Sequence, residues 1–406
     1  MTSQVILGNG HGVAIASDSA VTFGNRRTYD TSEKIYAIKQ PHSLAVLHAG
    51  NVTFHGMPYS TILDSYFHSL GDVQLMYVND YVHSFRKFLV EELHTWCDVA
   101  QQNLDFLSAL NDEFHRIWKR HKADEEELSE ESALKIWQSE IARCELFESH
   151  GFDSSWVDKW MQSIWTTQAN GWDGAEGQIE YWFDDVPRSS EIDSAIKKFV
   201  RSSITHFYPM SDENSATLTF VGYGRKSMIP HSVQLEIFGA LGDSVMLREE
   251  EANISTRQEN GFLLVELIGQ TDAIHSFLRG YDKDLMAEAE SALSQMFTQD
   301  DGESHENVAL AEGNHVKEGK RYDVNEQALE DALEKAFGGY AEKNKLASFR
   351  WTITGMPLAS LVSTAKSLID IQRLSLDIRG RLPTVGGPVK VATITKVGGF
   401  QWENRD

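Results

Sequence analysis

The chain lacks the features that mark secreted or membrane-anchored proteins. Among its 406 residues there are only two cysteines, Cys97 and Cys144, which lie in dissimilar surroundings. Such a pair does not suggest a disulfide framework and fits a reducing cytoplasm. The sequence has no apolar run of about eighteen residues, and its start has no basic stretch followed by an apolar core. We therefore expect a cytoplasmic protein without a transmembrane helix or a signal peptide.

Positive charge is also scarce. Lysine and arginine number 37 against 60 aspartates and glutamates, which gives a formal net charge of −23. This balance argues against nucleic acid or an anionic membrane as a partner. No metal-ligand spacing recurs around His305 and His315, which lie in a polar stretch, so we predict neither a metal nor another cofactor. The hydrophobic share of 41% is ordinary for a globular protein with a large core.

What the chain does have is a strongly patterned start. Short apolar runs occupy Gln4–Leu7, Gly12–Ala16, Lys34–Ile38 and Leu44–Leu47. Gly8-Asn9-Gly10 separates the first two, and glycine and asparagine tolerate the positive φ of a tight turn. The pattern predicts a β-hairpin that brings Asp18 near the start of the chain, followed by two further strands.

The second residue offers a specific chemistry. Met1 is usually removed when a small residue such as Thr2 follows, and Thr2 would then carry both a hydroxyl and a free α-amine. An α-amine can act as the general base for a neighbouring hydroxyl nucleophile. Lys34 is a candidate for the cation that lowers the pKa of this amine, with Asp18 holding Lys34 in place. The Gly50 amide, at a strand end, is a candidate donor to the oxyanion.

These residues resemble the amino-terminal segment of proteasome β-subunits and their bacterial ring-peptidase relatives, which are N-terminal-nucleophile (Ntn) hydrolases. With Thr2 as the first residue, Thr2, Asp18 and Lys34 match the family's catalytic threonine, aspartate and lysine without a gap. Ala49-Gly50 matches the turn that supplies the oxyanion amide, after a slightly longer loop. The resemblance implies an α+β fold, namely a four-layer αββα sandwich of the Ntn-hydrolase type, with Thr2, Asp18, Lys34 and Gly50 as catalytic residues.

The accessory groups of the family are harder to assign. A turn before a short helix carries a serine near the nucleophile's amine in the family, and Gln270, Thr271 or Asp272 is the candidate here. The alternative is a plain helix cap, in which Thr271 or Asp272 accepts from the first-turn amides.

A second departure lies near the end of the chain. The family carries an aspartate and a serine just before a Gly-Gly turn. This sequence has Leu382 and Val385 at about those places, with Thr384 between them, before Gly386-Gly387. The departure puts the accessory hydrogen bonds in doubt and leaves the core trio intact.

The rest of the chain alternates between core segments and insertions. We predict an Ntn-hydrolase core in residues 1–103, 204–282 and 351–406, a helical insertion in 104–203 and an acidic helical and loop insertion in 283–350. Further strands are expected at Ala216–Val221, Ser232–Ile237, Gly261–Ile268 and Val389–Thr395, and helices at Thr61–Leu70, Val78–Cys97, Val324–Phe337 and Leu358–Leu376. Six of the ten tryptophans fall between Trp137 and Trp182 within the first insertion, which indicates either a helical subdomain with an aromatic core or a lid that contacts a substrate or subunit.

The sequence therefore predicts a threonine-type peptidase whose substrate is a protein or peptide. Two alternatives stay open: a catalytically inactive assembly protein of the same fold, and an amidase with a non-peptide substrate. The resemblance also implies a homo-oligomer, ring or ring-like, with an unfolding ATPase as a candidate partner. It does not identify the residues that bind the substrate.

Overall fold

A computed structural model describes most of the chain. The described residues are 2–23, 26–29, 32–124, 129–146, 154–166, 174–184, 186, 188–206, 215–249, 253–254, 256–258, 261–282, 284–289, 291, 326–378 and 385–404. They divide into two compact units, each taken by itself below. The first unit comprises Met1–Ser32, Ser255–Thr393 and Trp402–Asp406, and the second comprises Glu33–Ile254 and Ile394–Gln401.

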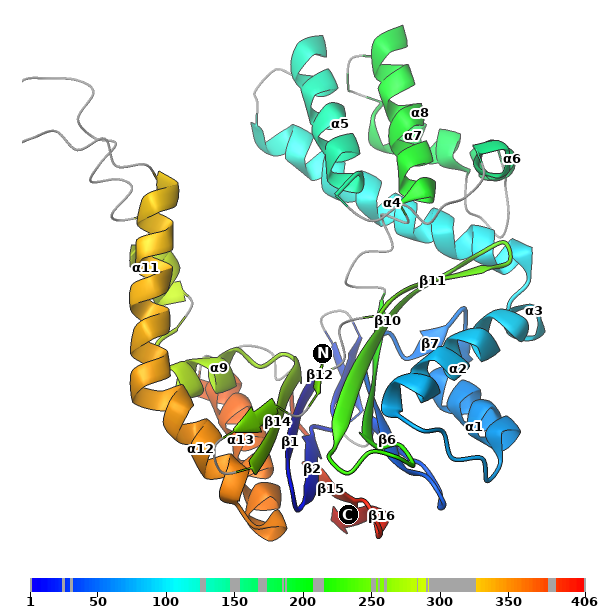
Figure 1. Cartoon of the computed structure of the whole chain (residues 1–406). Coiled ribbons are helices and arrows are strands. Elements are labelled where there is room, and N and C mark those ends of the chain that lie inside the picture. The colour runs from blue at the N-terminus through cyan, green and yellow to red at the C-terminus, as the bar shows by residue number, and fades with distance from the viewer. Residues whose placement is uncertain are drawn as a thin grey trace, which may run out of the picture. The chain divides into compact units, whose positions relative to one another are not determined.

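A six-stranded sheet forms the centre of the first unit (Figure 1). Its strands, in spatial order, are β13 (Thr256–Gln258), β14 (Gly261–Gly269), β1 (Ser3–Asn9), β2 (Gly12–Ser17), β15 (Lys390–Thr395) and β16 (Gly399–Asn404). β1 pairs antiparallel with both β14 and β2. The chain's start is therefore an internal strand, and Gln4 faces Ser17 across the predicted hairpin.

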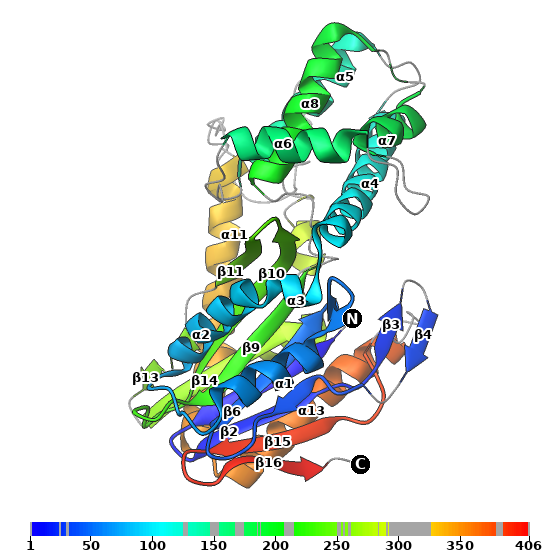
Figure 2. The same cartoon turned by 90° about the vertical axis from the view of Figure 1, so that its right-hand side faces the viewer.

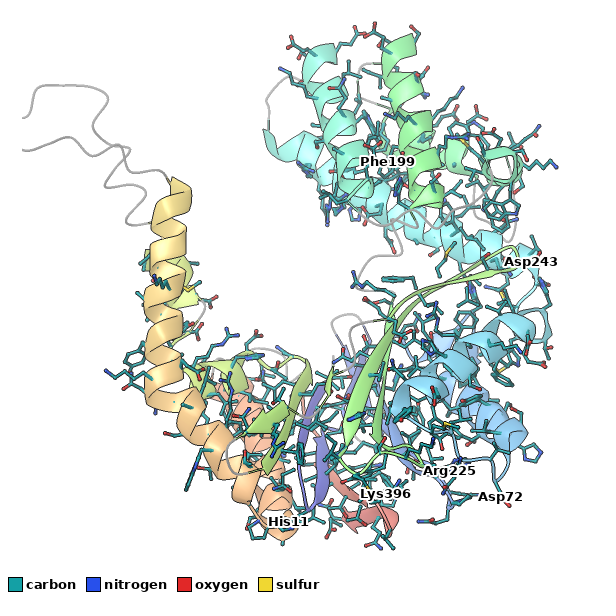
Figure 3. All side chains as sticks on the ribbon, viewed as in Figure 1. His11, Asp72, Phe199, Arg225, Asp243 and Lys396 are labelled. Carbon is teal, nitrogen blue, oxygen red and sulfur yellow. The ribbon has the colours of Figure 1, made fainter. Side chains whose placement is uncertain are left out.

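The hairpin turn differs slightly from its prediction, because β1 extends through Asn9 and the turn itself is Gly10-His11 (Figure 3). Asn9 is fully buried and connects the turn to the helix layer. Its side-chain oxygen accepts the His11 N–H at 2.8 Å, and its amide donates to the carbonyls of Ile353 and Met356 at 2.8 and 2.7 Å. Asn9 thus serves packing as well as turn geometry.

Helices cover one side of this sheet in Figure 1. They are α9 (Asp272–Arg279), α12 (Ala347–Gly355) and α13 (Leu358–Ile378), with α11 (Glu326–Ala341) and a π-helix (Glu342–Leu346) leading into α12. The apolar side chains of α13 pack against β1 and β2. The helix predicted to end at Phe337 continues through Gly338 and Gly339 to Ala341. Glycine costs a helix interior only about 1 kcal/mol, which neighbouring helical residues can offset.

A second antiparallel sheet forms the centre of the other unit. Its order is β11 (Ser244–Glu249), β10 (His231–Leu241), β9 (Ala216–Tyr223), β6 (Ser43–Gly50) and β5 (Ile35–Ala37), with β12 (Asn253–Ile254) paired to β10. Helices α1 (Tyr59–Leu70) and α2 (Val78–Glu91) pack on one of its faces (Figure 2). The predicted helix from Val78 to Cys97 is divided, because α2 ends at Glu91 and a short α3 (Leu93–Trp96) follows.

The segment predicted as the first insertion is helical, and its apolar core also includes Leu241 and Met246 of the β10–β11 hairpin. It consists of α4 (Val99–Asp124), α5 (Glu130–Cys144), α6 (Ser154–Trp165), α7 (Ala175–Trp182) and α8 (Ser190–Thr205). Phe199 lies at the centre of these helices (Figure 3). Trp137 and Trp160 are buried there, while Trp156, Trp165 and Trp182 are partly buried against the same cluster. These tryptophans serve packing within the helical subdomain, and Trp172 lies outside the described residues.

The sequence analysis did not predict two short hairpins. They are β3 (Val21–Phe23) with β4 (Arg26–Tyr29), and β7 (Thr53–Phe54) with β8 (Met57–Pro58). Strands of two to four residues carry too few alternations to produce a periodic signal.

Several other predictions concern the composition of the chain. Cys97 and Cys144 are both free thiols and buried. No helix within the described ranges is both long and apolar enough to cross a membrane. The polar stretch from Thr298 to Gly319, with His305 and His315, lies outside the described residues.

Candidate functional site

Asp18 is the most firmly held of the predicted site residues. It follows β2 directly and only 1% of its surface is exposed. One carboxylate oxygen accepts the Ser3 N–H at 2.9 Å, and the other accepts the Gly386 N–H at 3.3 Å. Hydrogen bonds to an ionised acceptor are stronger than neutral ones. The carboxylate of Asp18 is therefore fixed between the first strand and the Gly386-Gly387 turn.

Both the N–H and the carbonyl of Gly386 take part in hydrogen bonds. Its carbonyl accepts the N–H groups of Ser19 and Ala20 at 3.1 and 3.0 Å. The Ser19 hydroxyl donates to the carbonyl of Pro388 at 2.8 Å. The segment Asp18–Ala20 and the turn thus support each other, although 368 residues separate Asp18 from Gly386.

Thr2 is held by its own backbone. Its carbonyl accepts the Gln270 N–H at 2.7 Å, and 8% of the residue is exposed. Gly269 has a φ of +78°, and a Cβ at that position would lie 2.1 Å from the Thr2 carbonyl oxygen. Only glycine allows so close an approach in this conformation.

The segment Gln270–Asp272, which holds the candidates for the accessory group, does not cap α9 in the predicted way. Thr271 occupies the N-cap of α9, but its side chain makes no capping hydrogen bond. The first-turn N–H of Ala273 donates instead to the side-chain oxygen of Gln372 on α13, at 2.9 Å. The prediction that Thr271 or Asp272 caps this helix is therefore wrong, because a buried side chain from a distant helix satisfies the amide. Gln270 contributes its main-chain N–H to Thr2.

The segment before Gly386 is described only in part. Val385 is fully buried. Leu382 and Thr384 lie outside the described residues, so the accessory role considered for Thr384 stays a prediction.

Lys34 belongs to the second unit and lies immediately before β5. Only 5% of Lys34 is exposed, and its carbonyl accepts the His48 N–H at 3.0 Å. His48 is itself buried, and its Nε2 donates to the Asn51 carbonyl at 2.6 Å. Lys34 and His48 therefore form a buried polar pair. The sequence pattern singled out Lys34 but gave no signal for His48.

The pKa of His48 is lowered to about 4. Burial is the main cause, the hydrogen bond to Asn51 opposes it, and the nearby charge of Lys34 adds to the lowering. His48 is therefore neutral near pH 7 and contributes no charge beside Lys34.

The lowered pKa of His48 predicts a loss of stability in acid. The unfolded chain binds a proton at this histidine below about pH 6.5, whereas the folded chain does so only near pH 4, so stability falls as the pH drops through this window. We expect a loss of about 2–3 kcal/mol between pH 7 and pH 4.5 that is absent in His48→Gln. Urea unfolding of both proteins across this range measures it, and parallel pH profiles would contradict it.

Gly50 ends strand β6 with a φ of +84°. The Asn51 N–H points to β9, where it donates to the Ser215 carbonyl at 2.9 Å, whereas the His48 N–H points to Lys34. Because N–H groups alternate in direction along a strand of an antiparallel sheet, the Gly50 N–H is directed to the same side of β6 as Lys34. Lys34 and the candidate oxyanion donor thus lie on one side of the same strand.

The four predicted residues fall into two pairs. Thr2 and Asp18 belong to the first unit, and Lys34 and Gly50 belong to the second. Within the described residues, no group of three or more histidine, cysteine, aspartate or glutamate side chains could hold a metal ion. The first unit offers a hydroxyl and a fixed carboxylate, and the second offers a buried lysine and a strand-end amide.

Comparison with known proteins adds little to this description. No protein-family model matches the chain, and no curated protein matches it. Among solved structures, the chain is similar to Anbu (ancestral beta-subunit) from Yersinia bercovieri, with a TM-score of 0.30 and 10% sequence identity. That match covers 100% of this chain and 88% of the other. A TM-score of 0.30 is too low to establish a shared fold.

Proposed function

We propose that this protein is an N-terminal-threonine amidohydrolase that cleaves peptide bonds, with Thr2 as its nucleophile once Met1 is removed. The observation that carries the proposal is the rigid start of the chain. The Thr2 carbonyl is held by Gln270 at 2.7 Å, and the next N–H, that of Ser3, donates to the Asp18 carboxylate at 2.9 Å. Fixed placement of a reacting group accounts for a large part of enzymatic rate acceleration.

The proposed reaction has two stages. The Thr2 hydroxyl oxygen attacks the substrate carbonyl carbon while the α-amine of Thr2 takes the hydroxyl proton. The Gly50 N–H donates to the resulting oxyanion, and the amine returns the proton to the leaving nitrogen as the C–N bond breaks. Water, deprotonated by the same amine, then attacks the acyl carbon, and the amine returns that proton to the Thr2 oxygen as the ester bond breaks.

Lys34 is proposed to tune the α-amine, with Asp18 as its counter-charge. The burial of Lys34, of which only 5% is exposed, supports a role other than that of a surface charge. His48 is neutral near pH 7 and adds no positive charge beside Lys34.

The proposal includes the four-layer αββα sandwich and assembly into a ring-like homo-oligomer, with an unfolding ATPase as a candidate partner. Support for the sandwich comes from burial on both faces of the central strands. Neighbouring residues along a strand point to opposite faces, and Val5 and Ile6 of β1 are both fully buried, as are Val46 and Leu47 of β6. Assembly and the ATPase rest on the sequence resemblance alone.

An inactive assembly protein of the same fold is the second candidate function. Fully buried Val385 favours it, because the resembling family has a polar group at about this place. An amidase with a non-peptide substrate would use the same residues with a different pocket.

The first test concerns the amine itself. We expect intact mass spectrometry of the purified protein to show that Met1 is absent, because threonine at the second position permits its removal. Thr2→Leu serves as the control and is expected to keep Met1, since a bulky second residue blocks removal. Retention of Met1 by the unaltered protein would remove the proposed general base and favour the assembly protein.

A further inference from the structure

A polar cavity lies beside the candidate oxyanion turn in the second unit. Its volume is about 160 Å³, and its lining comes from the segment after Gly50, from α4 and from β10. An apolar cavity of about 150 Å³ is known to hold benzene, so this one has room for a group of about six non-hydrogen atoms. Asn51, which follows Gly50 directly, forms part of the wall.

His55 and Asp105 form the polar centre of this cavity. The side chain of His55 is 2% exposed, and its Nδ1 is hydrogen-bonded to the carboxylate of Asp105 on α4. Among the described residues, His55 is the only non-glycine residue with a positive φ, at +48°. Such a conformation is uncommon and costs energy, and it is found more often at functional sites.

The hydrogen bonds of His55 determine where its proton lies. The Ala240 N–H donates to Nε2 at 2.8 Å, so Nε2 must be unprotonated and the proton resides on Nδ1. Ala240 reaches the ring because β10 has an irregularity between Ile237 and Gly239. The imidazole is therefore neutral, and the negative charge of Asp105 is not cancelled by it.

The remaining lining also favours a cation. Among the residues that the structure describes, no lysine or arginine lines the cavity, whereas Asn51, Thr53 and Ser108 contribute polar side chains. Phe54, Tyr59 and Phe238 line it as well, and the Phe238 ring already has a guanidinium, that of Arg248, over its face at 5.7 Å. The Asp105 side chain is 33% exposed, and Gln101 donates to its other oxygen at 2.8 Å. A carboxylate can accept further hydrogen bonds beyond these two.

From this cavity we infer that the protein selects a basic side chain, lysine or arginine, beside the bond that it cleaves. The inference rests on the proposed function for the cleavage and on the cavity for the selection. Asp105 binds the ammonium or guanidinium group, and His55 is a positioning residue that orients the carboxylate. The helical insertion thus supplies, through α4, the residue that determines specificity.

The first experiment measures binding without cleavage. In the Thr2→Ala protein, n-butylammonium, which has the five non-hydrogen atoms of a lysine side chain, is expected to bind at least tenfold more tightly than n-butanol by NMR titration. Asp105→Asn is expected to remove this preference, because asparagine still accepts from His55 but has no charge. Asp112→Asn, on the same helix but outside the cavity lining, is the matched control and is expected to keep it.

A second variant covers the case in which Asp105→Asn does not fold. Ser108→Lys places an ammonium group at the cavity wall and is expected to abolish n-butylammonium binding. Equal binding of n-butylammonium and n-butanol to the Thr2→Ala protein would overturn the inference, as would unchanged cation binding in either cavity variant.

The second experiment links the cavity to cleavage. Fluorogenic peptides that differ only in lysine or norleucine before the scissile bond are expected to differ at least tenfold in kcat/KM, and Asp105→Asn is expected to remove the difference. Cleavage without this preference would overturn the inference and leave the proposed function standing. Cation binding without any Thr2-dependent cleavage would refute the proposed function and leave the cavity as a cation site.

Discussion

Thr2→Ala is expected to reduce peptide hydrolysis by at least about a thousandfold, because the variant has no hydroxyl to attack the carbonyl carbon. An epoxyketone or β-lactone probe is expected to add its mass to the peptide that begins with Thr2 in the unaltered protein and to leave Thr2→Ala unlabelled. The fold should persist, since the contact that fixes Thr2 is made by its backbone carbonyl with Gln270.

Two control variants make the Thr2 prediction specific. Thr2→Ser retains a hydroxyl and an α-amine and is expected to keep labelling. Ser3→Ala removes the adjacent hydroxyl but keeps the N–H that donates to Asp18, so it should label like the unaltered protein. Equal labelling of the unaltered protein and Thr2→Ala would refute the proposed nucleophile.

Gly50→Ala is expected to be among the most destabilising single substitutions in the chain. A Cβ at Gly50 would lie 2.2 Å from the Ser215 carbonyl oxygen, a distance that real Cβ atoms do not show. Gly56→Ala is a closely matched control, because Gly56 has the same φ of +84° and its Cβ would meet nothing within 4 Å. We expect Gly56→Ala to cost about 1–2 kcal/mol for the φ alone and Gly50→Ala to cost at least about 3 kcal/mol more.

Urea unfolding of the two glycine variants measures this difference directly. Since both substitutions add the same methyl group at the same φ, the difference isolates the steric conflict between β6 and β9. Equal destabilisation would show that this strand end has room to shift, and the Gly50 amide would then lack the fixed position that an oxyanion donor requires.

Local patterning made the first hairpin predictable. The runs Gln4–Leu7 and Gly12–Ala16 form β1 and β2, and their register places Ser3 beside Asp18. The contact between the Ser3 N–H and the Asp18 carboxylate is thus a consequence of a pairing that the sequence indicates. The hairpin of β9 with β10 was likewise predictable from alternating polar and apolar residues.

Contacts between distant segments were not predictable in this way. Nothing near Gly386 in the sequence indicates that its N–H reaches Asp18, and nothing near Gln372 indicates that it caps α9. The pairing of His55 with Asp105 depends on where α4 passes the β7–β8 hairpin. Such contacts depend on tertiary packing, and the local pattern of a single sequence carries no information about them.

The bond between Asp18 and Gly386 sets an order of events during biosynthesis. Asp18 emerges from the ribosome early, but its second hydrogen-bond partner is translated 368 residues later. Until Gly386 is translated, the carboxylate lacks the Gly386 N–H as a hydrogen-bond donor. The geometry around Thr2 is therefore completed late in translation. Any reaction of Thr2 that requires this geometry would be absent while the chain is still growing.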